Sequence, residues 1–418
     1  MLKILSNPAQ IVTVDTNGIN FKKGSSLKDL NILCDHAIIV EDHIIKDIIT
    51  NSRVEKFKSK VDEFIDVRDK VVLPGLVECH THSAFTGSRS NEFRERLNGK
   101  SYEEIAMAGG GINNTVQSVR NSSSKEIYNN TLNTINSFIK QGITTIEIKS
   151  GYGLDFDNEI KLLKVINNLK DSCSIDIIPT FLGAHTYPGR YKEKHDLYID
   201  EINNKMLPYI AENKLAEFCD GFCELTAFSA SEIDLIFSRA EEFGLNLRIH
   251  TEQFNNTGGL EVALKHNAVS VDHLEVLKEE QINLLNGKDT VCVLLPGVSF
   301  YLDYQYAPAR QLIDNNLTVA LSTDYNPGSS PVSDLHLILS LAAIKMGMTI
   351  EETISAVTIN AAKALKMNDK TGSIEIGKHA DFAVFDTTEY SDIVYNIGRN
   401  LNCMTIKNGE VIFETKIN

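Results

Sequence analysis

Two histidines separated by one residue, His80 and His82, follow an apolar run that starts at Leu73. On a β-strand, side chains at i and i+2 point to the same face, so both imidazoles are expected to project together from the end of a buried strand. Two adjacent imidazoles can bind one divalent metal ion. A His-x-His motif also occurs by chance in loops, so this interpretation depends on further ligand-type residues in the chain.

Three more candidates occur where apolar runs end. His250 ends the run GLNLRIH, His273 ends VSVDH, and Asp324 follows VALST. Each of them alone is more simply interpreted as a capping or loop residue. In a (β/α)8 barrel, however, the carboxyl ends of all strands converge at one mouth, where active sites are built. Together with the His-x-His pair, these residues predict a site for metal binding and proton transfer at that mouth.

The order of the predicted elements favours such a barrel. From Pro74 onward, apolar runs typical of buried strands alternate with amphipathic stretches typical of helices. The strand-like runs are 144–148, 175–182, 246–250, 270–273, 290–295 and 318–322. The helix-like stretches are 124–141, 158–169, 229–243, 332–346 and 350–365. Alternation over about 300 residues indicates an α/β fold with a parallel sheet, and at this length a closed (β/α)8 TIM-type barrel.

Both ends of the chain have β character. Strand-like runs occupy 11–14, 36–40, 43–48, 64–67 and 70–73, with a hairpin signal at Glu41 and Asp42. Near the other end, two alternating runs flank Gly377, and the runs 404–407 and 411–414 follow. We therefore predict a small β-sandwich domain formed from both termini. The predicted boundaries are 1–73 and 371–418 for the two parts of the β-sandwich, and 74–370 for the metal-dependent hydrolase barrel.

Composition excludes some classes of function. The 418 residues are 42% hydrophobic, which is enough for a barrel and a small second domain. The net charge is −15 and no dense Lys/Arg cluster is present, so nucleic acid and anionic membranes are not expected as partners. The first residues do not resemble a signal peptide, and no apolar run reaches the roughly 18 residues that span a bilayer.

Seven cysteines, an odd number, favour a reducing cytoplasm over a disulfide framework. Cys79 is next to His80, but strand alternation is expected to turn it away from the metal side, where it packs. Cys219 and Cys223 are spaced i,i+4 and could pair on a helix. A zinc ribbon would need a second cysteine pair, which the sequence does not provide.

Longer segments around these residues carry a resemblance to a known family. Six segments resemble the imidazolonepropionases, a family of the amidohydrolase superfamily that acts in histidine degradation: HTHSAFTGSRSNEFRERLNGKSYEEIAMAGGGI, EIKSGYGL, FLGAHTYP, HTEQF, LLPGVSFYL and STDYNPGSSP. GSRSNEF, KSGYGL and TDYNPGSSP separate this family from other amidohydrolases. The resemblance covers nearly the whole chain.

The resemblance implies a mononuclear site with one zinc or iron ion per subunit, held by His80, His82, His250 and Asp324. Such a donor set leaves a coordination position for water, and the metal lowers the pKa of that water so that hydroxide is available near neutral pH. Lys149 also lies at a strand end, and some superfamily members carry a metal-bridging carboxylated lysine. Because imidazolonepropionases hold one metal, Lys149 is left out of the ligand set. A homodimer is a further family-level expectation.

The substrate implied is 4-imidazolone-5-propanoate, which hydrolysis opens to N-formimidoyl-L-glutamate. A guanidinium fork is well shaped for its propionate, so Arg89 is the expected carboxylate clamp, although isolated arginines are commonly solvated. Gly328 can expose backbone N–H groups to a carboxylate or oxyanion, or can simply belong to a Pro/Gly turn. By resemblance, the residues that contact substrate or product are Arg89, Tyr152, His185, Gln253, Asn326, Gly328 and Ser329. The simpler alternatives are loop packing for Tyr152 and a structural hydrogen bond for His185.

The sequence leaves the proton-transfer residue open. Some family members carry His-x-Asp-Glu-Phe at the third histidine, with an acid/base role for the Glu, but that position here is Gln253. An amide cannot exchange protons at ordinary pH, so Asp324, His273 and Glu252 remain as candidates. Glu252 shares a face with His250 if the strand continues. We rank His273 as polarising the carbonyl, Asp324 as taking the proton of water, and Gln253 as a binding residue.

Two other functions are compatible with the same barrel. Another hydrolase of the superfamily, such as a cytosine- or guanine-type deaminase, would have no propionate for Arg89 to bind. A non-catalytic barrel would usually have lost metal ligands, whereas all four are present here. The amount of metal bound per chain distinguishes this last alternative from an enzyme.

Overall fold

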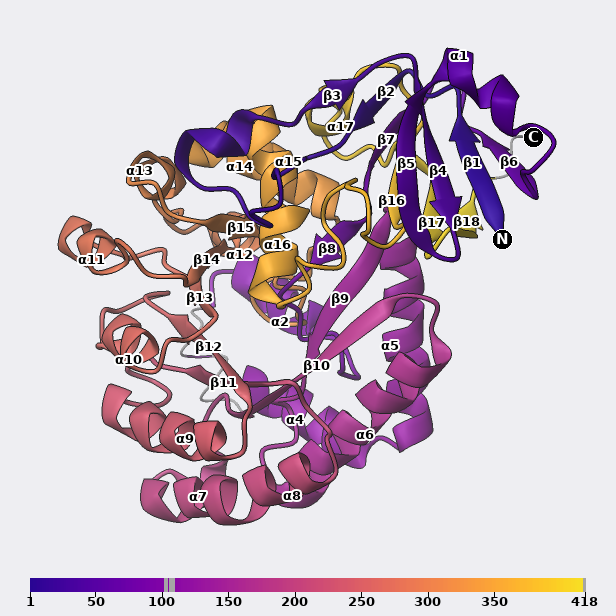
Figure 1. Cartoon of the computed structure of the whole chain (residues 1–418). Helices are drawn as coiled ribbons and strands as arrows, with labels where there is room; N and C mark the ends of the chain where they lie inside the picture. The colour runs from indigo at the N-terminus through magenta and orange to yellow at the C-terminus, as the bar shows by residue number, and fades with distance from the viewer. Residues whose placement is uncertain (101–103, 105–109, 416–418) are drawn as a thin grey trace.

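Eight parallel strands form the centre of the fold (Figure 1). The computed structural model describes residues 1–100, 104 and 110–415. The barrel strands, each paired with the next in sequence, are β8 (Leu76–Glu78), β9 (Ile143–Lys149), β10 (Asp176–Ala184), β11 (Phe218–Phe222), β12 (Asn246–Thr251), β13 (Ser270–His273), β14 (Val291–Leu294) and β15 (Val319–Leu321). Almost every residue in them is buried, as expected for parallel strands covered on both faces.

The first and last of these strands, β8 and β15, meet near their carboxyl ends. A parallel bridge joins Thr81 to Tyr325, and the His82 N–H donates to the Tyr325 carbonyl oxygen at 2.9 Å. The Glu78 carboxylate accepts the N–H of Thr323 at 3.2 Å. The strands therefore close into the predicted (β/α)8 barrel.

Helices connect the strands and cover the outside of the barrel (Figure 1). They are α2 (Ser90–Leu97), α4 (Ile112–Asn121), α5 (Ser124–Ile139), α6 (Phe156–Ser172), α7 (His195–Glu201), α8 (Leu207–Glu212), α9 (Ala230–Glu242), α10 (Gly259–Lys265), α11 (Glu279–Leu284), α12 (Pro296–Leu302), α13 (Ala309–Asp314), α14 (Leu335–Met346), α15 (Ile350–Ala356) and α16 (Ile359–Ala364), with short turns at η3 (Gly189–Tyr191) and η4 (Ile202–Met206). Capping boxes begin several of them; at α9, Ser229 and Glu232 bond each other's backbone N–H groups. Within the described residues, every helix is too short or too polar to cross a membrane.

The terminal segments form two further sheets beside the barrel (Figure 1). The first has the order β5-β4-β1-β6 and the second β18-β17-β16-β7-β2-β3. Their strands are β1 (Leu2–Ser6), β2 (Gln10–Val12), β3 (Ile32–Leu33), β4 (His36–Glu41), β5 (Ile44–Thr50), β6 (Glu63–Asp66), β7 (Val71–Pro74), β16 (Phe382–Phe385), β17 (Asn402–Lys407) and β18 (Glu410–Glu414). The short helices of these regions are η1 (Gly24–Lys28), α1 (Asn51–Val54), η2 (Glu55–Phe57) and α17 (Asp392–Tyr395).

The two terminal sheets share one apolar core. Ile38 of the first sheet belongs to the same buried cluster as Val72 and Phe382 of the second. Strands from both ends of the chain meet in the second sheet, where β7 pairs antiparallel with β16. The predicted β-sandwich formed from both termini is therefore confirmed.

Several local predictions are wrong. The helix predicted over 350–365 is two helices, α15 and α16, because the backbone at Thr358 (φ −118°, ψ −100°) leaves the helical region. Strands β1 and β11 were not predicted, and the helix considered for Cys219 and Cys223 falls on β11 and the residue after it. Strand β11 contains Asp and Gly, which are uncommon in strands, so its sequence does not have a pattern typical of a strand. The run before Gly377 is not a strand.

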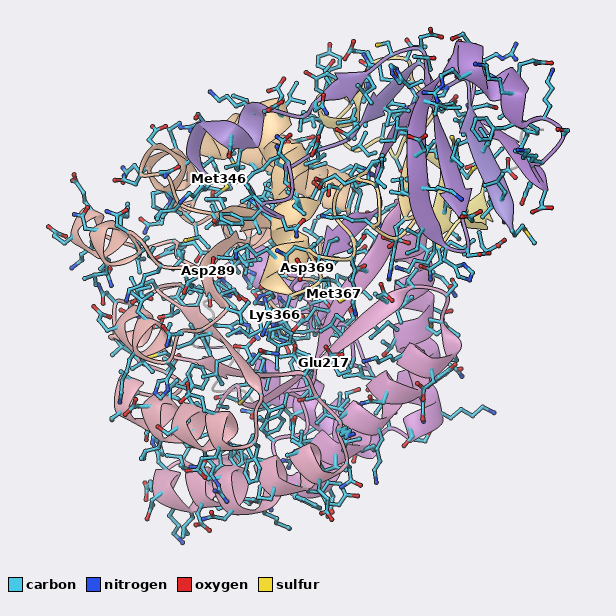
Figure 2. The ribbon with its side chains drawn as sticks, viewed as in Figure 1. Glu217, Asp289, Met346, Lys366, Met367 and Asp369 are labelled. Atoms are coloured by element: carbon cyan, nitrogen blue, oxygen red, sulfur yellow. The ribbon has the colours of Figure 1, made fainter. Side chains whose placement is uncertain are left out.

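The end of the barrel that faces the viewer in Figures 1 and 2 is the end where the strands begin. Glu217 and Asp289, both labelled there, lie just before β11 and β14. Helix α16 lies across this end, where Ala361 packs in one cluster with Val291 and Val293 of β14. The strands finish at the opposite end, so the candidate site residues are expected there.

Candidate metal centre and active site

The four predicted metal ligands lie at or just beyond the carboxyl ends of barrel strands. His80 and His82 follow β8, His250 is in β12, and Asp324 follows β15. Each of these residues is at most 3% exposed. The barrel therefore brings together residues that are up to 244 positions apart.

The ligand-type atoms of these residues converge. Asp324 Oδ1 lies 3.3 Å from His80 Nε2 and 3.2 Å from His82 Nε2, and His82 Nε2 lies 3.2 Å from His250 Nε2. Within the described residues, His80 Nε2 and Asp324 Oδ1 have no well-oriented hydrogen-bond partner. Burial lowers the pKa of His82 and of His250, which keeps both imidazoles neutral. Three imidazoles and one carboxylate fit a divalent zinc or iron ion.

Carboxylates hold the second ring nitrogen of two of the histidines. His80 Nδ1 donates to Asp272 Oδ2 at 2.6 Å, and His250 Nδ1 donates to Asp220 Oδ1 at 3.0 Å. This tautomer leaves the lone pair of each Nε2 facing the cluster. The sequence analysis missed both carboxylates. Asp272 could have been found by its position next to His273 in a barrel strand, whereas Asp220 lies in the strand that was not predicted.

His82 is oriented by ring contacts. Its ring stacks on His185, with centroids 5.1 Å apart and 22° between the planes, and the Tyr152 centroid is 5.9 Å away. His185 Nδ1 donates to the Gly151 carbonyl oxygen at 2.9 Å, and burial lowers the pKa of His185 to about 3. The structure therefore brings Tyr152 and a neutral His185 to the metal-ligand cluster, with His185 Nε2 as an acceptor.

His273 ends β13 beside the same cluster. Its ring centroid lies 5.4 Å from that of His250 and 5.9 Å from that of His80. Burial opposes the charged form of His273, but the carboxylates of Glu275, Asp324 and Asp272 together outweigh burial and raise the pKa of His273; Glu275 Oε1 lies 3.3 Å from His273 Nδ1. A histidine that retains its proton can donate to an oxygen on which negative charge develops.

Arg89 directly precedes α2, and its guanidinium reaches the loop after β15. Arg89 Nε donates to Glu92 Oε2 at 2.8 Å, while Glu92 Oε1 accepts from the Gly111 N–H at 3.2 Å and from Asn114 Nδ2 at 3.1 Å. A Cβ on Gly328 would lie 2.1 Å from Arg89 Nη1, so the guanidinium packs directly against this glycine. The Arg89 side chain is only 12% exposed and is not a solvated surface arginine. Glu92, which the sequence analysis missed, fixes the orientation of the Arg89 guanidinium through its Nε.

Asn326 organises the loop that follows Asp324. Its Oδ1 accepts the N–H groups of Gly328 and Ser329, each at 2.8 Å, and its Nδ2 donates to the Asp324 carbonyl oxygen at 2.7 Å. Because Asn326 already accepts the Gly328 N–H, the structure favours the alternative in which Gly328 belongs to a turn. The missing side chain of Gly328 makes room for the Arg89 guanidinium.

Glu252 does not continue the strand that carries His250. Strand β12 ends at Thr251, and Glu252 has a left-handed backbone with φ +51°. Its carboxylate accepts hydrogen bonds from the Thr251 hydroxyl and from Gln281 Nε2, the latter at 3.3 Å. The prediction that Glu252 shares the face of His250 is therefore wrong. Gln253 follows it and is 5% exposed.

Lys149, which was left out of the ligand set, ends β9 with a fully buried side chain. Its Nζ lies 2.8 Å from Glu147 Oε1 and 2.8 Å from Asp220 Oδ2. Arg248 is also fully buried, and its Nη2 lies 2.7 Å from Asp272 Oδ2. Both cations thus contact carboxylates, and two of these carboxylates are the partners of His80 and His250, the histidines predicted as metal ligands.

Sequence comparison finds a family match that covers most of the chain. The profile described as the amidohydrolase family matches residues 71–412. A protein named imidazolonepropionase from Clostridium tetani is 40% identical over 412 residues, which cover 98% of each chain. Another of that name, from Caldanaerobacter subterraneus subsp. tengcongensis, is 44% identical over 336 residues, or 80% of this chain and 81% of that protein.

Structural comparison finds the same architecture in solved structures. A triazine hydrolase variant has a TM-score of 0.77 at 16% identity, with 99% of this chain and 95% of that chain covered. A zinc-bound adenosine deaminase from Xanthomonas campestris has a TM-score of 0.71 at 16% identity, with 100% and 94% covered. At such low identity these similarities support the fold alone.

Proposed function

The chain belongs to the amidohydrolase family of metal-dependent hydrolases and, within it, to the imidazolonepropionases; on this premise we propose that it hydrolyses 4-imidazolone-5-propanoate to N-formimidoyl-L-glutamate, in histidine degradation. The main support is the position of Arg89. Its guanidinium packs against Gly328, which lies on the loop that follows Asp324 of the His/Asp cluster. A cation on this loop suits a substrate whose carboxylate lies close to a hydrolysable ring.

We assign one zinc or iron ion per subunit to His80, His82, His250 and Asp324. This assignment is supported by the convergence of their ligand atoms and by His80 Nε2 and Asp324 Oδ1, which have no well-oriented hydrogen-bond partner among the described residues. When bound, such an ion supplies Lewis acidity, which activates water and polarises a carbonyl. Metal analysis of the purified protein identifies which of the two ions is native, because this donor set accepts both.

The propionate is assigned to the two Nη groups of Arg89. Glu92 engages Nε and thereby fixes the plane of the guanidinium, so that a carboxylate can accept two parallel hydrogen bonds. The ring of the substrate would lie between this clamp and the His/Asp cluster, close to the stacked rings of His82 and His185. The other proposed substrate contacts are Tyr152, Gln253, Asn326, Gly328 and Ser329.

Hydrolysis requires a proton to move from water to the departing ring nitrogen. The water oxygen bonds to the ring carbonyl carbon, the C–N bond breaks, and the released nitrogen takes up a proton while the new carboxylic acid ionises. We assign the proton of the water to Asp324 and the stabilisation of the carbonyl oxygen to His273. Glu252 has no part in this scheme, because its carboxylate is bonded to Thr251 and Gln281.

We also propose that the enzyme is cytoplasmic and homodimeric. All seven cysteines lie in the described residues and all are free thiols, which is typical of a reducing compartment. The homodimer is proposed from family resemblance alone, and analytical ultracentrifugation of the purified protein tests it.

The direct test of function is incubation of the metal-loaded protein with freshly generated 4-imidazolone-5-propanoate. We expect the ultraviolet absorbance of the substrate to disappear and mass spectrometry to identify N-formimidoyl-L-glutamate, whereas the chelated protein leaves the substrate unchanged. Cytosine and guanine, which carry no propionate, serve as negative controls. Unchanged substrate with folded, metal-loaded protein would refute the proposed reaction.

A further inference from the structure

Five charged side chains form a fully buried network on the barrel strands. They are Glu147 and Lys149 of β9, Asp220 of β11, Arg248 of β12 and Asp272 of β13, and each is 0% exposed. Removing charges from water is costly, so a network of this kind persists only where its members pair closely. Its placement next to the histidine cluster indicates a role beyond stability.

Each cation of the network contacts at least one carboxylate that orients a histidine, and Arg248 contacts both, since its Nε also lies 3.8 Å from Asp220 Oδ2. Lys149 Nζ lies 2.8 Å from Asp220 Oδ2, and the other oxygen of Asp220, Oδ1, accepts from His250 Nδ1 at 3.0 Å. Arg248 Nη2 lies 2.7 Å from Asp272 Oδ2, the oxygen that also accepts from His80 Nδ1 at 2.6 Å.

Glu147 joins the two halves of the network. Its Oε1 lies 2.8 Å from Lys149 Nζ and 3.7 Å from Arg248 Nη1. Its Oε2 accepts the N–H of Thr81, the residue between the two histidines of the His-x-His motif, at 3.0 Å.

We infer that Lys149 and Arg248 are positioning residues for the metal centre: they hold Asp220 and Asp272 in place and, through these carboxylates, orient the rings of His250 and His80. The inference rests on the metal ligands proposed above. A buried carboxylate that loses a cation loses one of the contacts that fix its direction, so the ring that donates to it is also held less firmly.

The charges of the network also suit a divalent cation. Three carboxylates face two cations, which leaves one negative charge, and Asp324 of the ligand cluster adds a second. Two negative charges in a buried site are balanced by one divalent ion. Lys149 thus acts as a fixed internal cation and is not a ligand.

The test compares Lys149→Met and Arg248→Met with Lys407→Met as a matched control. Lys407 is also buried and bridges two carboxylates that lie outside the histidine cluster, Asp176 at 2.6 Å and Asp381 at 2.7 Å. The affinity of each full-length protein for Zn²⁺ is measured by chelator competition, and its stability by urea unfolding. We expect all three variants to lose stability, but only Lys149→Met and Arg248→Met to lose Zn²⁺ affinity, by about 10- to 100-fold.

A milder variant covers the case in which removal of a buried charge prevents folding. Arg248→Lys keeps the charge but loses the guanidinium fork, so it is expected to fold, to bind Zn²⁺ several-fold more weakly, and to shift the visible spectrum of the Co²⁺-substituted protein. If Arg248→Lys leaves both affinity and spectrum unchanged, or if Lys149→Met loses no more affinity than Lys407→Met, the inference is overturned.

His80→Ala separates this inference from the proposal on which it rests. If His80→Ala binds Zn²⁺ as tightly as the parent protein, the proposed ligand set is wrong. If His80→Ala loses Zn²⁺ affinity while Lys149→Met and Arg248→Met behave like Lys407→Met, the ligand set stands and only the positioning role fails.

Discussion

Replacement of Gly328 by alanine tests the carboxylate clamp without touching a charged group. Gly328 does not have a left-handed backbone, so alanine is compatible with its conformation. The new Cβ would lie 2.1 Å from Arg89 Nη1, where ordinary contacts begin at 3.4 Å. The guanidinium must therefore move by about 1.3 Å, which is enough to break a charge-assisted hydrogen bond with a normal length of about 2.8 Å.

We expect this displacement to appear mainly in KM for 4-imidazolone-5-propanoate. Loss of a charge-assisted hydrogen bond costs roughly 1.5–3 kcal/mol, which corresponds to a rise in KM of about 10- to 100-fold. The contact is made in the ground state and in the transition state alike, so kcat is expected to change less. The assay is steady-state kinetics followed by substrate absorbance.

Two comparisons make the Gly328→Ala result specific. Gly189→Ala is the control variant, because a Cβ there meets no atom within 4 Å, and it should leave KM and stability unchanged. A substrate analogue without the carboxylate should be a poor substrate for the parent enzyme and should be affected little by Gly328→Ala. The assignment of Arg89 as the clamp would be refuted if KM for the natural substrate were unchanged, or if KM for the analogue rose by the same factor.

Three further predictions concern the histidines. His80→Ala and His250→Ala are expected to lose bound metal and turnover together while circular dichroism stays unchanged, because an open catalytic site has no spare protein ligand; full metal content by mass spectrometry would remove them from the ligand set. His273→Ala is expected to keep its metal but to lose about 10²-fold or more in kcat, the scale of a lost acid–base or electrostatic group; a metal-free variant would instead make His273 a ligand. His336 is 2% exposed, neither ring nitrogen has a hydrogen-bond partner within the described residues, and burial lowers its pKa. The His336 ring therefore binds a proton more tightly in the unfolded chain than in the folded protein. This histidine costs no stability above about pH 6.5, but below that pH the free energy of unfolding falls by up to about 1.4 kcal/mol per pH unit. The free energy of unfolding, measured with urea at about pH 7.5 and pH 5.5, should fall less between these two pH values for His336→Leu than for the parent protein. Equal decreases would contradict this role of His336.

The barrel and the convergence of its histidines could be predicted because both depend on local pattern. An apolar run followed by a polar ligand, as at His250 and Asp324, shows where a strand ends. The (β/α)8 topology then fixes that all such ends meet at one mouth. No distance between these residues has to be known for this step.

The partners of the ligands depend on tertiary packing and could not be predicted in the same way. Asp220 reaches His250 because β11 pairs with β12, and β11 carries Asp and Gly, which obscure it as a strand. The position of Glu252 was predicted wrongly because its own left-handed backbone ends the strand, and with it the alternation of side chains between the two faces. The contact between Arg89 and Gly328 joins two loops that no short-range pattern relates.

The closure of the barrel has a consequence for the protein without its metal. Strands β8 and β15 meet through the bridge between Thr81 and Tyr325, and the proposed ligands lie on both sides of this junction, with His80 and His82 after β8 and Asp324 after β15. A bound ion would cross-link the first and last strands of the barrel, because its ligands come from both of them. At a free metal concentration of 100 times Kd, such a cross-link adds about 2.7 kcal/mol to stability. Removal of the ion by a chelator should therefore open the barrel first at the junction between β8 and β15. Faster hydrogen exchange at the His82 amide would be the earliest sign of this opening.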